Sequence, residues 1–260
     1  MTDLSPVCRI CHPHVSDLIG NMMKQKIVFV SGGSRGLGKE ILKTFKTNSW
    51  ITISCSRQPG ENISTDNELW YQCDLSDPDA VAAMFCEIRK KVSHIDLIVN
   101  NAAIAGASMP GTEGAIETWE RTLKTNLSGP FFVIHYAMPL LKAGSLILNI
   151  SSVLGHKGVP DQAAYCAAKH GLIGMTRSMA LAMAPSGINV NAICPGWLET
   201  DMARQRSKEL QLSISELAAQ VPKGQMTDIR EIADLVFFMG SGHLRNMTGQ
   251  SIIIDGGMLA

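Results

Sequence analysis

The sequence predicts an α/β protein built on one doubly wound, Rossmann-type parallel sheet with helices on both faces. Short apolar runs rich in Val and Ile alternate with longer segments of helical periodicity along the chain. These runs are continuous rather than alternating with polar residues, which is typical of parallel strands buried on both faces. A chain of 260 residues, 45% of them hydrophobic, is long enough for one such domain with a substantial core.

The first half of the chain supplies four of the expected strands. KIVFVS (26–31) is a strand that runs into a glycine-rich turn and a helix over 36–48. WITISCS and ELWYQCD are expected strands over 50–56 and 68–74. The connection between them, RQPGENISTDN, is short and broken by Pro and Gly, so we expect a loop or a stub of helix there. A helix over 77–92 leads into the strand HIDLIVN, 94–100.

The second half repeats the alternation. Helices are expected over 115–142, before the strand SLILNIS, and a long helix over 161–184 precedes the strand GINVNAICP. These two strands cover 145–151 and 187–195. A polar helical stretch, a further helix and the short strand SIIID complete the chain over 203–219, 228–240 and 251–255.

Composition narrows the classes of partner. Lys plus Arg and Asp plus Glu each total 23, so no net charge favours nucleic acid or an anionic membrane as a partner. No apolar run reaches the ~18 residues of a membrane span, and the first 21 residues hold no signal-peptide core. Seven scattered cysteines suit reduced thiols better than a disulfide framework. We expect a soluble, cytoplasmic protein.

We expect a single domain over 23–260, because the chain has no internal repeat, low-complexity tract or linker. Residues 1–22 are expected to be a disordered extension, since MMKQKIVFV from Met22 has the character of an ordinary beginning. Within the extension, Cys8, Cys11 and His12 match the spacing of covalent haem attachment, and with His14 they could form half of a zinc site. No export signal and no second ligand pair accompany them, so no metal site is expected.

The turn after the first strand, SGGSRGLGKEI, indicates a nucleotide-binding loop. Gly32, Gly36 and Gly38 follow the spacing G-x-x-x-G-x-G between a strand and a helix. Glycines there let the backbone approach a pyrophosphate, whose charge lies at the helix N-terminus. The expected contacts come from Gly32, Ser34, Arg35, Gly36, Leu37 and Gly38.

The end of the second strand favours NADP(H) over NAD(H). An acidic residue at this position would bind the ribose 2′-hydroxyl of NAD. The sequence has CSRQ instead, with Ser56 and Arg57, and Arg35 adds a second guanidinium from the glycine loop. Two guanidiniums suit a 2′-phosphate. The alternative is that both arginines are solvated surface residues.

The segment YCAAK places Tyr165 four residues before Lys169 on an apolar helix. Residues at this spacing lie on one helix face, so a phenol and an ammonium can share one small site. The alternative is a tyrosine packed at a helix interface with a lysine extending past it.

Taken together, the motifs resemble those of the short-chain dehydrogenase/reductase family from about Lys26 to Gly257. They are SGGSRGLG, CDLSD, NNAA (100–103), KTNLSG (124–129), NISSVLG (149–155), YCAAK (165–169), PGWLET (195–200) and DGG (255–257). The 13-residue interval from Ser152 to Tyr165 also matches. Two departures are small: Ser31 stands where threonine is usual, and Ala103 replaces the last glycine of N-N-A-G.

The resemblance implies a role for each matching residue. Tyr165 would be the acid/base, Lys169 its partner and a ligand of the nicotinamide ribose, Ser152 the group that polarises the carbonyl, and Asn126 the holder of a water in the proton relay. We expect Lys169, together with the positive nicotinamide of the oxidised cofactor, to lower the pKa of Tyr165. Further cofactor contacts are expected from Asp74, Leu75, Asn101, Ala102, Ala103, Pro195, Gly196, Leu198 and Thr200.

On the substrate side, the resemblance implies a mobile lid near 200–222. Trp197, Leu198 and Met202 are expected to line the pocket, and His156 is a further candidate at the rim. The charged run RQRSKEL (204–210) is expected to be a solvated face of the lid.

The resemblance also implies the reaction, the interconversion of a ketone and a secondary alcohol. The expected activity is NADPH-dependent reduction of a 3-oxoacyl thioester, by similarity to 3-oxoacyl-[acyl-carrier-protein] reductases and related ketoreductases. The alternatives are oxidation of a hydroxy acid, polyol or other small alcohol, and a catalytically silent cofactor-binding protein on the same fold. A homotetramer or homodimer is expected, with the helices over 115–142 and 161–184 between subunits.

Overall fold

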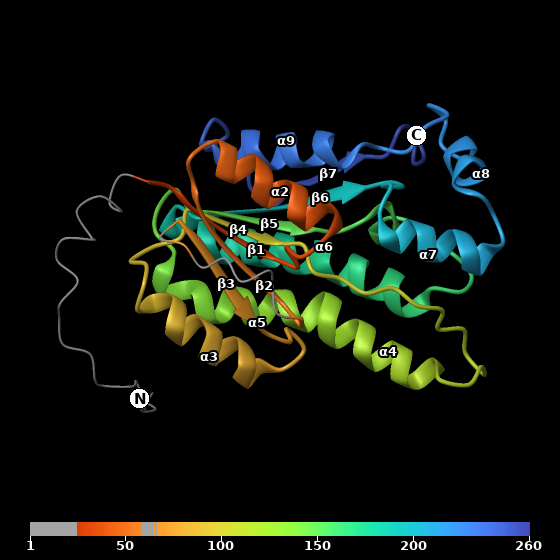
Figure 1. Ribbon diagram of the computed structural model, residues 1–260, viewed down its shortest axis with the longest axis horizontal. Coiled ribbons are helices and arrows are strands. Elements are labelled where there is room, and N and C mark those ends of the chain that lie inside the picture. Colours follow the sequence, from red (N-terminus) through yellow and green to blue (C-terminus); the bar gives the residue numbers. More distant parts are fainter. Residues whose placement is uncertain (1–24, 59–64, 66) are drawn as a thin grey trace.

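The computed structural model (Figure 1) describes residues 25–58, 65 and 67–260. Its seven strands form one parallel sheet in the order β3-β2-β1-β4-β5-β6-β7, which confirms the predicted fold class. The strands are β1 (Ile27–Ser31), β2 (Ile51–Ser56), β3 (Glu68–Gln72), β4 (Leu97–Asn100), β5 (Leu146–Ile150), β6 (Asn189–Pro195) and β7 (Ser251–Ile254). The strand order reverses between β1 and β4, and such a reversal places a ligand crevice at the carboxyl ends of the strands.

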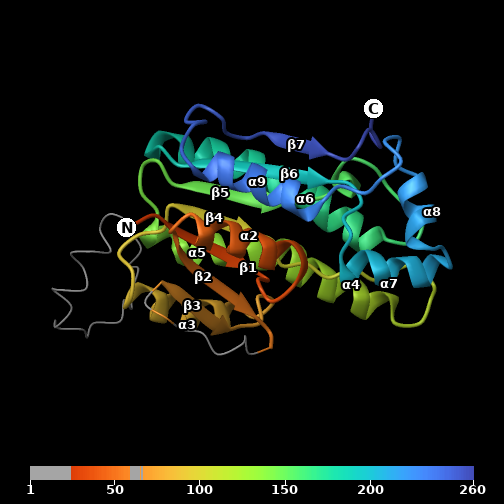
Figure 2. The ribbon, with the colours of Figure 1, turned by 45° about the horizontal axis from the view of Figure 1, so that its top comes forward.

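Helices cover both faces of the sheet (Figures 1 and 2). On one face lie α2 (Gly36–Thr47) and α9 (Ile229–Gly240), and on the other lie α3 (Pro78–Arg89), α5 (Gly129–Ala137) and α6 (Ala163–Met183). Strand β1 contributes to both cores, since Phe29 packs with α3 and Val30 packs with α2. Burial on both faces is the physical reason for the continuous apolar strands.

The predicted helical region over 115–142 is interrupted. It comprises α4 (Ala115–Leu123), a π-helical turn (Lys124–Ser128), α5 and a 3₁₀ turn (Met138–Leu140). The π-helical turn contains Asn126, and such turns are frequent at functional sites. Further 3₁₀ turns span Val153–Gly155 and Ala184–Ser186.

The polar helical stretch expected over 203–219 consists of two helices. These are α7 (Asp201–Leu210) and α8 (Ile214–Ala219). Gln211 ends α7 with a left-handed φ of 54°, and Ser213 begins α8 through a capping box with Glu216. Both helices lie at the end of the sheet toward which the strands point (Figure 2).

Three further expectations bear on the chain as a whole. None of the described helices is long and apolar enough to cross a membrane. Within the described ranges, Cys55, Cys73, Cys86, Cys166 and Cys194 have free thiols. The CRICHPH motif and most of the connection between β2 and β3 lie outside the described residues.

Candidate active site

A cleft of about 1440 Å³ opens at the carboxyl edge of the sheet, between the glycine turn and α7. It brings together most of the residues proposed from the sequence. They are Gly32, Ser34, Arg35, Gly36, Leu37, Ser56, Arg57, Asp74, Leu75, Asn101, Ala102, Ala103, Ser152, Tyr165, Lys169, Pro195, Gly196, Trp197, Leu198, Thr200 and Met202. Three proposed residues, Gly38, Asn126 and His156, do not line it.

Gly38 shapes the glycine turn from behind the cleft. A Cβ atom at this position would lie 2.3 Å from the carbonyl oxygen of Gly32 and 2.6 Å from Nδ2 of Asn101. Only glycine therefore allows α2 to start so close to the end of β1. Gly36 has a left-handed φ of 54° and faces Thr200 across the cleft.

The N-terminus of α2 suits a phosphate group. Its first turn holds no acidic residue, and no side chain caps its backbone N–H groups. These amides and the helix dipole therefore remain available to an anion. Together with the close backbone approach at Gly38, this arrangement fits the pyrophosphate of a dinucleotide.

The neighbouring loop is tied to the glycine turn by Ser31. Its Oγ accepts hydrogen bonds from the backbone N–H groups of Asn101 (3.0 Å) and Ala102 (3.1 Å). Asn101 Nδ2 donates back to the Ser31 carbonyl oxygen at 3.0 Å. These bonds need only a hydroxyl group, which serine and threonine both have, so Ser31 can replace the usual threonine.

Two guanidiniums reach the cleft beside the end of β2. Arg57 follows β2 directly and is exposed, while Arg35 makes an exposed ion pair with Asp201, at 3.7 Å. The nearby Asp74 carboxylate accepts from the N–H and the hydroxyl of Ser76. Arg57 is therefore an exposed cation at the end of β2, while the charge of Arg35 is shared with Asp201.

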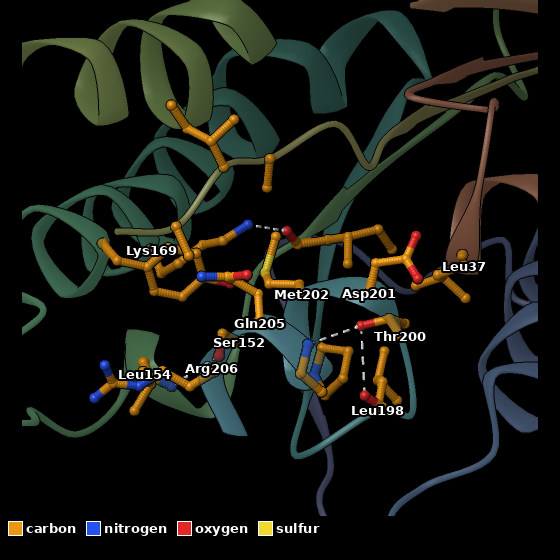
Figure 3. A pocket seen from close by; sticks show the side chains of 18 of the residues that line it. Leu37, Ser152, Leu154, Lys169, Leu198, Thr200, Asp201, Met202, Gln205 and Arg206 are labelled. Atoms are coloured by element: carbon orange, nitrogen blue, oxygen red, sulfur yellow. Dashed lines mark hydrogen bonds between the residues drawn. The ribbon is translucent and has the colours of Figure 1, made fainter. Parts of the chain in front are cut away.

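Tyr165 and Lys169 both line the cleft from α6, and Figure 3 shows Lys169 there. Lys169 is buried, with its Nζ 5.5 Å from the centroid of the Tyr165 ring. The same ammonium donates to the carbonyl oxygen of Ile150 at 2.7 Å. This bond fixes Lys169 beneath the tyrosine, at the point where β5 ends.

The expected depression of the Tyr165 pKa applies to the site with oxidised cofactor bound and stays a prediction; in the cofactor-free protein the pKa is raised. Burial raises the pKa of Tyr165 to about 12, although hydrogen bonding with Ser152 lowers it in part. Burial also lowers the pKa of Lys169 to about 8. Desolvation disfavours the charged forms of both groups and is the largest cause of both shifts.

Ser152 lies at the end of β5 and begins the 3₁₀ turn Val153–Gly155. Its Oγ accepts from the N–H of Leu154 at 3.1 Å, which leaves its own hydroxyl hydrogen free to point at Tyr165 or a substrate oxygen.

Asn126 is buried outside the cleft lining and braces the loop after β4. Its Oδ1 accepts from the Ile104 N–H at 2.9 Å, and its Nδ2 donates to the Ile104 carbonyl oxygen at 2.7 Å. Both polar atoms of the side chain are therefore in use.

Two interpretations of the substrate side need correction. His156 is exposed and lies outside the cleft lining, although Leu154 and Lys157 on either side of it belong to that lining. Within the run 204–210, Arg206 is not solvated: only 11% of its side chain is exposed. Sequence reasoning missed several lining residues, which are Leu154, Lys157, Asp161, Gln162, Gln205 and Arg206. Local patterns gave no signal for the pairing of Arg206 with Asp161.

Comparisons with known proteins agree with this arrangement. The family model described as enoyl-(acyl carrier protein) reductase matches residues 33–259. The chain is 34% identical over 240 residues to the 3-oxoacyl-[acyl-carrier-protein] reductase FabG of Escherichia coli, covering 90% of this chain and 97% of that protein. It is 30% identical over 261 residues to a 3beta-hydroxysteroid dehydrogenase of Mediterraneibacter gnavus, with coverages of 90% and 94%.

The chain is also 31% identical over 241 residues to a short-chain type dehydrogenase/reductase of Sinorhizobium fredii. The match covers 90% of this chain but only 44% of the length of that longer protein. Among solved structures, the Pseudomonas aeruginosa RhlG/NADP active-site complex superposes with a TM-score of 0.81 at 26% identity, covering 90% of this chain and 96% of that one. The chain therefore belongs to the short-chain dehydrogenase/reductase family, as an oxidoreductase that acts on a secondary alcohol or ketone.

Proposed function

We propose that the protein is an NADP(H)-dependent reductase of a ketone, with a 3-oxoacyl thioester as its substrate class. The observation that carries the proposal is one cleft that joins Arg35 and Arg57 at one end to Ser152, Tyr165 and Lys169 at the other. The relative named FabG supports the thioester, and the NADP in the RhlG complex supports the cofactor.

The residues present suit NADP(H) at each part of the cleft. The free amides at the start of α2 would hold the pyrophosphate, and Arg35 and Arg57 would pair with the 2′-phosphate. Lys169 would reach the nicotinamide ribose. When bound, the reduced cofactor supplies a hydride to the carbonyl carbon of the substrate.

Tyr165 would supply the proton, and Ser152 the hydrogen bond that polarises the substrate carbonyl. Tyr165 is protonated at neutral pH, because burial keeps its pKa high, so its hydroxyl can donate a proton to the carbonyl oxygen. The Ser152 hydroxyl donates a hydrogen bond to the same oxygen as negative charge develops. The Lys169 ammonium then stabilises the tyrosinate that remains.

Reprotonation of Tyr165 requires a path for a proton. The Asn126 side chain is occupied by Ile104, so we assign the water-holding role to the Asn126 main-chain carbonyl. Four residues on stands Pro130, which has no N–H to donate to that carbonyl in the usual helical pattern. The carbonyl thereby lacks the α-helical donor that would compete with a water.

The experiment is NADPH and NADH oxidation by the purified protein with acetoacetyl-coenzyme A over a range of concentrations. Fast NADPH oxidation at micromolar substrate supports both halves of the proposal. Preference for NADH would overturn the cofactor assignment. Cofactor binding without turnover would move the substrate class to another ketone.

A second candidate is oxidation of a secondary alcohol with NADP⁺. The cleft walls near Tyr165 are largely apolar, with Leu154, Val159, Trp197 and Met202 among them, and would accept a bulky alcohol. The relative named 3beta-hydroxysteroid dehydrogenase points the same way. A panel of hydroxy acids, polyols and hydroxysteroids with NADP⁺ separates this candidate from the first.

We also propose a cytoplasmic homotetramer, with a homodimer as the alternative. Two groups of exposed apolar side chains support it. The first, on α4, α5 and α6, comprises Ile116, Trp119, Phe131 and Leu181, and the second, on and near α9 and β7, comprises Phe238, Leu244 and Ile253. Two separate self-complementary surfaces are what a tetramer with dihedral symmetry needs.

A further inference from the structure

Two arginines of the charged helix α7, Arg204 and Arg206, differ in burial and in their ion-pair partners. Arg206 Nη2 donates to both carboxylate oxygens of Asp161, at 2.8 and 2.7 Å, and Nη1 donates to Glu209 at 3.1 Å. Its side chain is only 11% exposed. Arg204, two residues before it, is 52% exposed and pairs with the exposed Glu199 and Asp201.

Asp161 is a firm anchor for this pair. Its carbonyl oxygen accepts from the N–H of Ser108 at 2.9 Å, and the buried Ser108 hydroxyl accepts from the N–H of Ala164 at 3.0 Å. Asp161 is therefore tied both to the loop after β4 and to the first turn of α6. That same helix carries Tyr165, four residues after Asp161.

The ion pair of Arg206 with Asp161 is a largely buried polar contact between α7 and the wall of the cleft that carries Tyr165 and Lys169. At its other end α7 begins at Thr200, where the ion pair of Asp201 with Arg35 is exposed and 3.7 Å long. Exposed pairs contribute little to stability, whereas a largely buried arginine on a carboxylate is charge-assisted and costly to break. Met202 and Gln205, between the two ends, line the cleft (Figure 3).

We propose that Arg206 and Asp161 form a substrate clamp. They are positioning residues that hold α7 against the start of α6, so that Met202 and Gln205 complete the wall around the reacting carbonyl. The proposal rests on the proposed function for its kinetic readout. At the start of α7, Thr200 and the ion pair of Asp201 with Arg35, which border the cofactor end of the cleft, keep their contacts when the clamp is removed. The clamp therefore governs substrate affinity, and we expect NADPH affinity to stay unchanged.

The test compares five forms of the full-length chain: wild type, Arg206→Met, Arg206→Lys, Asp161→Asn and the double variant Arg206→Met/Asp161→Asn. Arg204→Met is the matched control on the same helix. For each form we would measure kcat and KM for the ketone, the Kd of NADPH, and hydrogen exchange of residues 201–219 with NADPH bound. The exchange measurement needs no turnover.

Arg206→Met and Asp161→Asn are each expected to raise KM about 10- to 100-fold, the cost of losing a charge-assisted bond, with NADPH affinity unchanged. The double variant should be no worse than either single variant, and Arg206→Lys should recover part of the loss. Exchange over 201–219 should accelerate in the same variants and not in Arg204→Met.

Unchanged KM and unchanged exchange in Arg206→Met would overturn the clamp. So would additive effects in the double variant, or equal effects in Arg204→Met. Wild-type protein that reduces no ketone would contradict the proposed function instead, and the exchange comparison would still decide for or against the clamp. Should Arg206→Met fail to fold, Asp161→Asn and Arg206→Lys carry the same comparison.

Discussion

Burial acts in opposite directions on the two ionisable groups of α6. It raises the pKa of Tyr165 to about 12 and lowers that of Lys169 to about 8. Both shifts favour the neutral forms, so at neutral pH the buried charge of Lys169 is held at a cost to stability. At neutral pH the tyrosine keeps its proton for donation and the lysine keeps its charge, which is the pairing that ketone reduction requires.

The Lys169 shift predicts a pH-dependent stability. Between about pH 8 and 10.5 the unfolded chain binds more protons at this lysine than the folded one, so stability rises with pH in this window. The wild type should gain on the order of 3 kcal/mol over Lys169→Met across it. Urea unfolding at pH 7 to 10 measures this gain. This range lies below the pH at which the raised pKa of Tyr165 makes the stability of the folded protein fall as pH rises. Parallel curves for the two proteins would refute the assignment.

Replacing glycine by alanine should have opposite effects at Gly38 and at Gly174. Gly38→Ala would place a methyl group 2.3 Å from the Gly32 carbonyl oxygen, so the turn must shift and NADPH affinity should fall by about tenfold or more. Gly174→Ala is the matched control inside α6, because no atom outside its own helix backbone lies within 4 Å of the position that its Cβ would take. It should stabilise the protein by about 0.5–1 kcal/mol and leave NADPH binding unchanged. Equal NADPH affinity in both variants, measured by fluorescence titration, would contradict the role of Gly38.

At the scale of elements, the π-helical turn between α4 and α5 joins the sheet edge to the catalytic helix. Asn126 holds both backbone groups of Ile104, and Asn126→Ala leaves that N–H and carbonyl without their partner. We expect a loss of about 1–3 kcal/mol in unfolding free energy, together with slower ketone reduction. Denaturant titration and kcat at saturating substrate test the two effects. Full stability in Asn126→Ala would show that the brace is dispensable.

Much of the fold was predictable because its strands are buried on both faces and its motifs stand where strands end. Helix spacing predicted that Tyr165 and Lys169 share one face of a helix, while their roles, like those of Ser152 and Asn126, needed the family resemblance. The split at Gln211 was missed, although the capping box of Ser213 and Glu216 was visible in the sequence. Arg206 could not be predicted, since its partner lies 45 residues away.

At the scale of the whole molecule, the two apolar surfaces predict an assembly that can be dissected. Ile116 and Leu181 are 73% and 80% exposed, which is costly for side chains of this size in a monomer. Ile116→Glu and Phe238→Glu should each reduce a tetramer to dimers, and the double variant should be monomeric. Light scattering after size exclusion reads the masses directly. A monomeric wild type would contradict the assembly.

We propose that Tyr165 donates the proton in an NADPH-dependent ketone reduction. The most direct test of this proposal is Tyr165→Phe, with NADPH binding and NADPH oxidation by a ketone measured on the same sample. We predict unchanged NADPH affinity and a loss of about 10²- to 10⁴-fold in kcat, the contribution of a general acid. Ketone reduction by Tyr165→Phe at close to the wild-type rate would contradict the role of Tyr165 as the proton donor.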